Sequence, residues 1–90
     1  MPEYKLDILK AAYDHSIHNQ EEIRKSDMCG CFFCKKTFKP VAIAEWTDIE
    51  TTKGETALCP HCAHDSVIGS DSGFPVSDED FLTAMSEHWF

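Results

Sequence analysis

The sequence predicts a small α+β protein, and three of its features carry that prediction. Two Cys-x-x-Cys units lie in the middle of the chain, an amphipathic stretch lies at each end, and a short alternating segment separates the two cysteine units. Paired cysteine units of this kind favour a zinc-ribbon-like or treble-clef-like core stabilised by a metal. The predicted fold is therefore a metal-stabilised core with a short β-hairpin, flanked by N- and C-terminal helices.

The N-terminal region, residues 1–27, is predicted to be helical. Over residues 3–17, apolar side chains recur at the spacing of one helix face. This stripe consists of Leu6, Leu9, Tyr13 and Ile17. Asn19 is followed three residues later by Glu22, which resembles an N-cap and its reciprocal acid, so a second short helix is predicted over residues 20–26.

The central region, residues 28–68, contains both cysteine units. Proline is favoured at the first position of a helix, so we predict a turn or one helical turn over residues 40–46. Residues 46–52 alternate as a weak strand does, and residues 53–55 contain a glycine suited to a turn. The chain is then expected to return as a second strand over residues 56–58, which completes the hairpin.

The last region, residues 69–90, is predicted to be a loop followed by a helix. Residues 69–73 are rich in Gly, Ser and Asp, which is typical of a loop. Ser77 with Asp80 three residues later resembles a capping box, so the C-terminal helix is expected to start there. Its apolar face consists of Phe81, Leu82, Met85 and Trp89. We expect Phe90 to dock on the rest of a single domain that spans residues 1–90.

Composition and charge exclude several classes of function. The 90 residues are 42% hydrophobic and 27% charged, which indicates a globular chain with no membrane span. The formal net charge of −8 disfavours nucleic acids and anionic membranes as partners. The first ten residues contain acids and no apolar signal segment, so we expect a cytoplasmic protein with reduced cysteines.

The charge is unevenly distributed along the sequence. Residues 24–39 contain five basic side chains and one acid, which gives a local charge of +4. Residues 54–90 contain seven acids and no Lys or Arg, which gives −7. Either segment is a candidate surface for a partner, although an ordinary solvated surface is the favoured explanation.

The four cysteines of the two units are the candidate metal ligands. They are Cys31, Cys34, Cys59 and Cys62, with 24 residues between the two units. Two cysteines three residues apart can present both sulfur atoms to one ion, and two such turns supply the four thiolates of a tetrahedral Zn²⁺ site. A site with four protein ligands has no open position for a substrate, so one structural zinc ion and no catalytic residues are expected. The fifth cysteine, Cys29, is interpreted as a small buried residue beside the site or a reactive thiol.

Two enzymatic alternatives remain open from the sequence. Cys59-Pro60-His61-Cys62 matches the active-site motif of strongly oxidising thioredoxin-fold enzymes, which would make the protein a thiol–disulfide oxidoreductase acting through Cys59 and Cys62. A weaker alternative is a zinc-supported nuclease or nucleic-acid-binding module. Its candidate residues are His15, His18, His61, His64 and Asp65.

Two further groups of side chains are open to a structural or a functional interpretation. Asp65 and Ser66, together with the histidines of the first helix, are candidates to line a shallow binding site, although such side chains also cap turns. The aromatic residues near the first cysteine unit are expected to be core rather than an exposed platform. They are Phe32, Phe33, Phe38 and Trp46.

The two cysteine motifs, the segment 65–75 and the closing Phe81-Leu82, Met85 and Trp89-Phe90 resemble a family of small bacterial cytoplasmic proteins without established function. The resemblance covers roughly residues 12–90. It implies zinc-ribbon-like metal binding and a cytoplasmic location, and it contributes no catalytic residue. The family has Gly after the second Cys-x-x-Cys, where this chain has Ala63, which puts a left-handed turn there in question.

Together these observations predict a small cytoplasmic zinc-binding protein with a structural metal ion. Its expected role is interaction with another protein or regulation, and neither a membrane nor nucleic acid is an expected partner.

Overall fold

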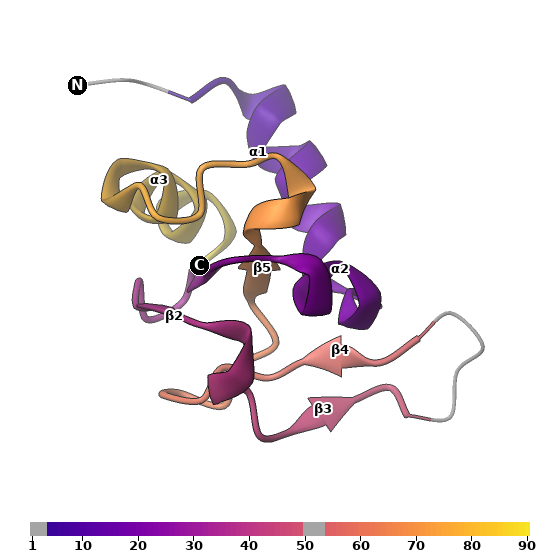
Figure 1. Ribbon diagram of the computed structural model, residues 1–90. Helices are drawn as coiled ribbons and strands as arrows, with labels where there is room; N and C mark the ends of the chain where they lie inside the picture. The colour runs from indigo at the N-terminus through magenta and orange to yellow at the C-terminus, as the bar shows by residue number, and fades with distance from the viewer. Residues whose placement is uncertain (1–3, 50–53) are drawn as a thin grey trace.

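The computed structural model describes residues 4–49 and 54–90. Along the chain, the helices are α1 (Leu6–Tyr13), η1 (Asp14–Ser16), α2 (Gln20–Lys25), η2 (Pro40–Ala42), η3 (Ser70–Ser72) and α3 (Glu79–Trp89), where η marks a short 3₁₀ helix. The strands are β1 (Cys29–Cys31), β2 (Thr37–Phe38), β3 (Trp46–Thr47), β4 (Thr56–Ala57) and β5 (Val67–Gly69). Helices at both ends and small antiparallel sheets between them confirm the predicted α+β class (Figure 1).

The strands form two small sheets. In the larger sheet, β1 lies between β2 and β5 and is antiparallel to both. In the smaller sheet, β3 pairs with β4, with Trp46 opposite Ala57. This pairing is the predicted hairpin, although part of its turn, residues 50–53, lies outside the described residues. The chain passes from β4 back to β5 through the second cysteine unit.

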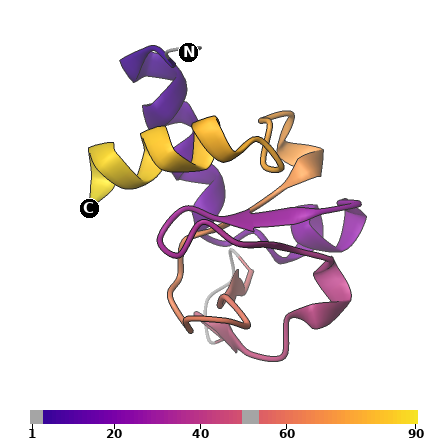
Figure 2. The same ribbon diagram turned by 90° about the vertical axis from the view of Figure 1, so that its left-hand side faces the viewer.

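The larger sheet has a hydrophobic core on each face. Successive side chains of a strand point to opposite faces of the sheet. Phe32 and Ile68 therefore join α1 and α3 in one core, which we call the helical core. Cys31 and Val67 join the smaller sheet in the other, which we call the second core. Figure 2 shows α1 and α3 on one side of the sheet and η2 with the hairpin on the other side. The cysteine units therefore belong to the second core.

A glycine in β1 permits this layered packing. A Cβ atom on Gly30 would lie 2.4 Å from the backbone oxygen of Val76, so the chain before α3 can lie against β1 only because no side chain is present there. The Cδ2 atom of Leu82 also lies close to that position, at 3.1 Å.

The first helical region is shorter and less buried than predicted. The α-helix ends at Tyr13 and continues as the 3₁₀ turn η1, and residue 3 of the predicted span 3–17 lies outside the described residues. Leu9 and Ala12 are buried, but Leu6 is 49% exposed and Ile17 is 51% exposed. The buried face of this helix is thus narrower than the predicted stripe.

The second helix, α2, follows the prediction in position but its capping box is wrong. The side chain of Asn19 makes no cap hydrogen bond. Instead, its amide nitrogen donates to the carbonyl oxygens of His15 and Val67, both at 2.8 Å, and its oxygen accepts from the amide of Ala57 at 3.1 Å. Glu22, the predicted reciprocal acid, accepts from the imidazole of His15. Asn19 therefore joins α2 to both sheets.

The C-terminal helix begins one residue later than predicted. Its N-cap is Asp78, whose carboxylate accepts from the amide of Asp80 at 3.0 Å, so the prediction of Ser77 as the cap is wrong. The predicted loop at residues 69–73 contains the 3₁₀ turn η3. Among the described residues, no helix is long and apolar enough to cross a membrane.

Candidate metal centre

The first cysteine unit is the tip of the hairpin between β1 and β2. In this loop, residues 31–36, the amide of Lys35 donates to the carbonyl oxygen of Cys31 at 2.8 Å. The amide of Cys31 donates in turn to the carbonyl oxygen of Lys36 at 3.0 Å. These two bonds close the loop and curl the peptide around the sulfur atoms of Cys31 and Cys34.

The second cysteine unit repeats this geometry between β4 and β5. In residues 59–64, the amide of Ala63 donates to the carbonyl oxygen of Cys59 at 2.9 Å, and the amide of Cys59 donates to the carbonyl oxygen of His64 at 2.9 Å. Ala63 and Lys35 occupy the same place in the two loops, and both have φ of 64°. The left-handed turn that Ala63 put in question is therefore present.

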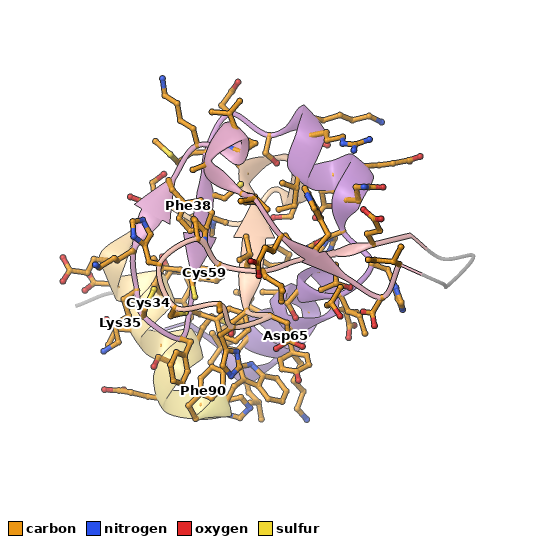
Figure 3. All side chains as sticks on the ribbon, turned by 90° about the horizontal axis from the view of Figure 1, so that it is seen from below. Cys34, Lys35, Phe38, Cys59, Asp65 and Phe90 are labelled. Atoms are coloured by element: carbon orange, nitrogen blue, oxygen red, sulfur yellow. The ribbon has the colours of Figure 1, made fainter. Side chains whose placement is uncertain are left out.

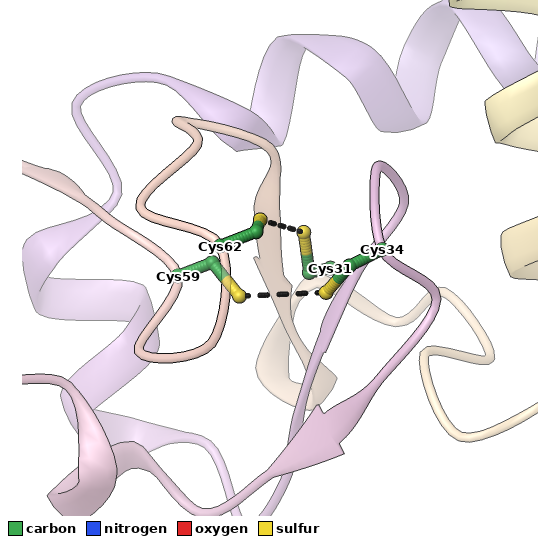
Figure 4. A group of neighbouring side chains, drawn as sticks. All are labelled: Cys31, Cys34, Cys59 and Cys62. Carbon is green, nitrogen blue, oxygen red and sulfur yellow. Dashed lines mark hydrogen bonds between the residues drawn. The ribbon is translucent and has the colours of Figure 1, made fainter.

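The two loops face each other and bring four sulfur atoms together (Figure 4). The sulfur atoms of Cys31 and Cys62 are 3.7 Å apart, and those of Cys34 and Cys59 are 3.6 Å apart. All four lie within 4.8 Å of one another. A disulfide needs about 2.05 Å, whereas a tetrahedron with Zn–S bonds of about 2.3 Å has edges of about 3.8 Å. The four cysteines are thus positioned to hold one metal ion.

Burial disfavours the thiolate form of two of the four cysteines. Burial raises the pKa of Cys31 and of Cys59 above that of a free thiol. Burial also acts on Cys34, but hydrogen bonds from the Lys36 amide and from the neighbouring thiols hold the pKa of Cys34 below its usual value. Because a dication at the centre would favour all four thiolates, the donor set suits a thiophilic metal.

Cys29 is separate from this cluster. It lies in β1 with no exposed surface, and burial raises the pKa of its thiol to about 12. Its neighbour along the strand, Gly30, separates it from Cys31, and Cys29 is not among the residues that surround the candidate metal position. The structure supports the interpretation of Cys29 as a buried core residue rather than a reactive thiol.

The local structure lacks the helix that thiol oxidoreductases use to stabilise their thiolate. Residues after Cys62 form a loop and then β5, so no helix begins at the Cys59 unit. Cys59 is also buried, and its sulfur contacts Cys34 of the other loop. The Cys59 and Cys62 pair therefore lies in a loop that faces the first cysteine unit.

The histidines of the nuclease alternative lie apart. The Nδ1 atom of His15 pairs with Glu22 at 2.9 Å, and Nδ1 of His18 lies 2.9 Å from the carbonyl oxygen of Gly54. His61 is exposed and lies beside Phe38. Within residues 4–49 and 54–90, the four-cysteine cluster is the one group of three or more Cys, His, Asp or Glu side chains close enough to share a metal.

The aromatic residues near the first unit are core with one exception. Phe32 and Phe38 are buried, and Trp46 packs against the second core. Phe33 is 45% exposed, so its prediction as core is wrong. Its ring stacks on the imidazole of His64 at a centroid distance of 4.4 Å, which links the two cysteine loops on the outside.

Asp65 and Ser66 line a cavity of about 130 Å³, but the predicted histidine neighbours do not. Its other walls come from the end of α1, from η1 and from the end of α3. The lining residues are Tyr13, Ser16, Ile17, Phe32, His64, Asp65, Ser66, Trp89 and Phe90. The polar sequence after the second unit marked one wall of this cavity, whereas the aromatic walls depend on tertiary packing and carried no sequence signal.

No protein-family model, curated protein or solved structure matches the chain. The resemblance to small bacterial cytoplasmic proteins is therefore a prediction, and the assignment of the site depends on its own geometry.

Proposed function

We propose that the protein binds one Zn²⁺ ion as a structural element and acts without catalysis, by binding another protein in the cytoplasm. The observation that carries the zinc assignment is the pair of matching loops, which bring four sulfur atoms within the distances expected between the corners of a ZnS₄ tetrahedron. Four sulfur ligands suit zinc or iron, and all four positions are occupied by protein. Such an ion joins two segments of chain and leaves no place for a substrate.

The metal content of the purified protein tests the zinc assignment. Zinc should be present at one ion per chain, and replacement of any one of Cys31, Cys34, Cys59 or Cys62 by Ser should remove it. Cys29→Ser is the matched control, because this residue lies in the same strand but outside the cluster, and it should keep the ion. Iron in place of zinc, or a metal-free folded protein that oxidises a dithiol substrate, would contradict the proposal.

Exposed apolar side chains support the proposal of a protein partner. Val41 in η2 is 91% exposed and Ile49 after β3 is 67% exposed. Between η2 and the second cysteine loop lies a depression of about 430 Å³ whose lining includes Leu58 and Pro60. Apolar surface of this kind, on an otherwise acidic protein, favours contact with another protein rather than with nucleic acid.

Co-purification with a single surface variant tests this part of the proposal. A specific partner should bind the wild-type protein and bind Val41→Asp at least about tenfold more weakly, because a charge would lose its water in the interface. Val41 makes little contact with its own chain, so the variant should fold and bind metal normally. A partner that binds both proteins equally would place the interface elsewhere.

A further inference from the structure

The cavity beside the second cysteine loop is lined by aromatic rings. Tyr13 and Trp89 have ring centroids 4.0 Å apart, and Phe32 and Phe90 have centroids 5.7 Å apart. All four contribute to the wall of the cavity. The indole nitrogen of Trp89 donates to the carbonyl oxygen of Leu9 at 3.3 Å, which fixes the ring in place. The cavity is thus a preformed aromatic pocket.

Asp65 contributes a carboxylate to the wall of this pocket. The side chain of Asp65 is 62% exposed, and its Oδ1 lies 3.3 Å from Nδ1 of His64. Figure 3 shows Asp65 on the same side of the molecule as Phe90. The described lining includes no Lys or Arg, and residues 54–90 contain neither in the sequence. Asp65 is therefore the one carboxylate among the described lining residues, and the one basic side chain there is its neighbour His64.

The two serine hydroxyl groups of the wall have partners within the protein. The Oγ of Ser16 donates to the carbonyl oxygen of Tyr13 at 2.7 Å, and the Oγ of Ser66 pairs with Nδ1 of His64. Within the described residues, no buried side-chain nitrogen or oxygen lacks a partner. A ligand in the cavity would therefore meet mainly the rings of Tyr13, Trp89 and Phe90, the imidazole of His64 and the Asp65 carboxylate.

From these features we infer that the pocket binds an alkylated ammonium group. The negative faces of aromatic rings attract a cation, and a quaternary ammonium group loses its hydration more easily than a primary amine. The cavity of about 130 Å³ has room for a trimethylammonium group, is too small for a drug-sized ligand, and combines aromatic rings with polar side chains in its walls. This inference goes beyond the structural zinc site, although Phe32 and His64 belong to the loops that the metal would hold.

Choline and its neutral carbon isostere, 3,3-dimethylbutan-1-ol, test the inference by NMR titration of protein of measured metal content. Choline should shift the indole signal of Trp89 and the amides of residues 64–66 in a saturable way. The isostere has the same shape without the charge and should bind about tenfold more weakly. Equal binding of choline and the isostere would overturn the inference while leaving the zinc assignment unaffected, and so would the absence of a saturable shift with about 50 mM choline and with the trimethyllysine peptide described below.

A matched pair of variants distinguishes a specific contribution of the Asp65 carboxylate to choline binding from nonspecific attraction by the acidic chain. Asp65→Asn should weaken choline binding about three- to tenfold and leave binding of the isostere unchanged. Asp71→Asn removes one exposed carboxylate that does not line the cavity and should leave choline binding unchanged. If both variants weaken choline equally, attraction is nonspecific and the inference fails.

The source of the ammonium group is distinguished by a second ligand. A short neutral peptide that contains trimethyllysine carries the same headgroup on a protein side chain. Tighter binding of this peptide than of choline would assign the pocket to a modified protein, whereas tighter binding of choline would assign it to a free solute. Failure of both ligands to bind would contradict the inference.

Discussion

Each cysteine loop turns through one residue in the left-handed conformation. Lys35 and Ala63 both have φ of 64°, where a Cβ atom costs roughly 1 kcal/mol relative to Gly. Their amides nevertheless donate the hydrogen bonds that close the two loops. The loops thus adopt backbone geometry that their sequence does not favour, and the proposed metal ion would offset this cost.

Ala63→Gly is therefore expected to stabilise the protein by about 1 kcal/mol, because Gly adopts positive φ without steric cost. The midpoint of thermal unfolding of the metal-loaded protein measures this gain. Ala11→Gly, on the exposed side of α1, is the matched control and should cost about 1 kcal/mol. Destabilisation by both changes would show that the second loop does not require a left-handed residue.

Tyr4 is held to the start of α3 by a single polar contact. Its phenol donates to the carboxylate of Asp78 at 2.5 Å, and this hydrogen bond, with burial and the nearby negative charges, raises the pKa of Tyr4 from 10.0 to about 12. Because the folded state favours the protonated phenol, the contact contributes stability fully below pH 10, and this contribution is lost as the pH rises toward 12.

Absorbance titration of the phenolate should therefore show one tyrosine that ionises near pH 12 in the folded protein. Tyr4→Phe should remove this transition. Asp78→Asn should lower it, since the amide side chain carries no negative charge. Retention of the high transition in Tyr4→Phe would assign it to another group and contradict the contact.

At the scale of the elements, the cap of α3 shows the limit of sequence patterns. Ser77 and Asp78 are both good N-cap residues, and the spacing of Ser77 to Asp80 favoured the first. In the structure, the Asp78 carboxylate caps the helix and also accepts from Tyr4, which is 74 residues away in sequence. A local pattern contains no information about such a distant donor.

Alanine variants distinguish the two caps. Asp78→Ala should cost about 1–2 kcal/mol, because α3 loses its cap and Tyr4 loses its acceptor. Ser77→Ala should change the stability by less than about 0.5 kcal/mol, since Ser77 is exposed. Chemical denaturation of the metal-loaded variants measures both values. A larger loss of stability in Ser77→Ala than in Asp78→Ala would show that Ser77 is the N-cap and would contradict the assignment of Asp78.

Asn19 also shows the limit of local sequence patterns, because here a predicted cap residue makes tertiary contacts instead of a cap. Its place before a helix predicted a cap, but the side chain is buried and bonds to His15, Val67 and Ala57 instead. Three backbone groups from three parts of the chain compete successfully with the local cap because they are buried and would otherwise lack partners. The position of α2 could be predicted from the sequence, whereas the tertiary hydrogen bonds of Asn19 that hold the start of this helix could not.

At the scale of the whole molecule, the α+β class and the clustering of the four cysteines could be predicted, because ligand spacing is a local property of each loop. The arrangement of the two cores could not. Phe32 and Cys31 are neighbours in sequence but lie on opposite faces of the sheet, one in the helical core and one beside the candidate metal position. Such a division depends on strand register, which the short strands of this chain specify weakly.

Each core alone is small. The helical core contains eight buried residues, and the second core contains eight, of which Cys29, Cys31 and Cys59 contribute little apolar surface. A chain of this length buries a modest share of its surface, so a metal that contributes about 10 kcal/mol or more would dominate the stability of the second core. The two cysteine loops and the hairpin depend on that core.

Removal of the metal under reducing conditions tests this account most directly. We predict that a strong chelator releases one zinc ion per chain and abolishes the cooperative thermal transition, and that added zinc restores it. Circular dichroism with parallel metal analysis measures both events on one sample. A metal-free, reduced protein that unfolds at the same temperature as the untreated protein would contradict the account.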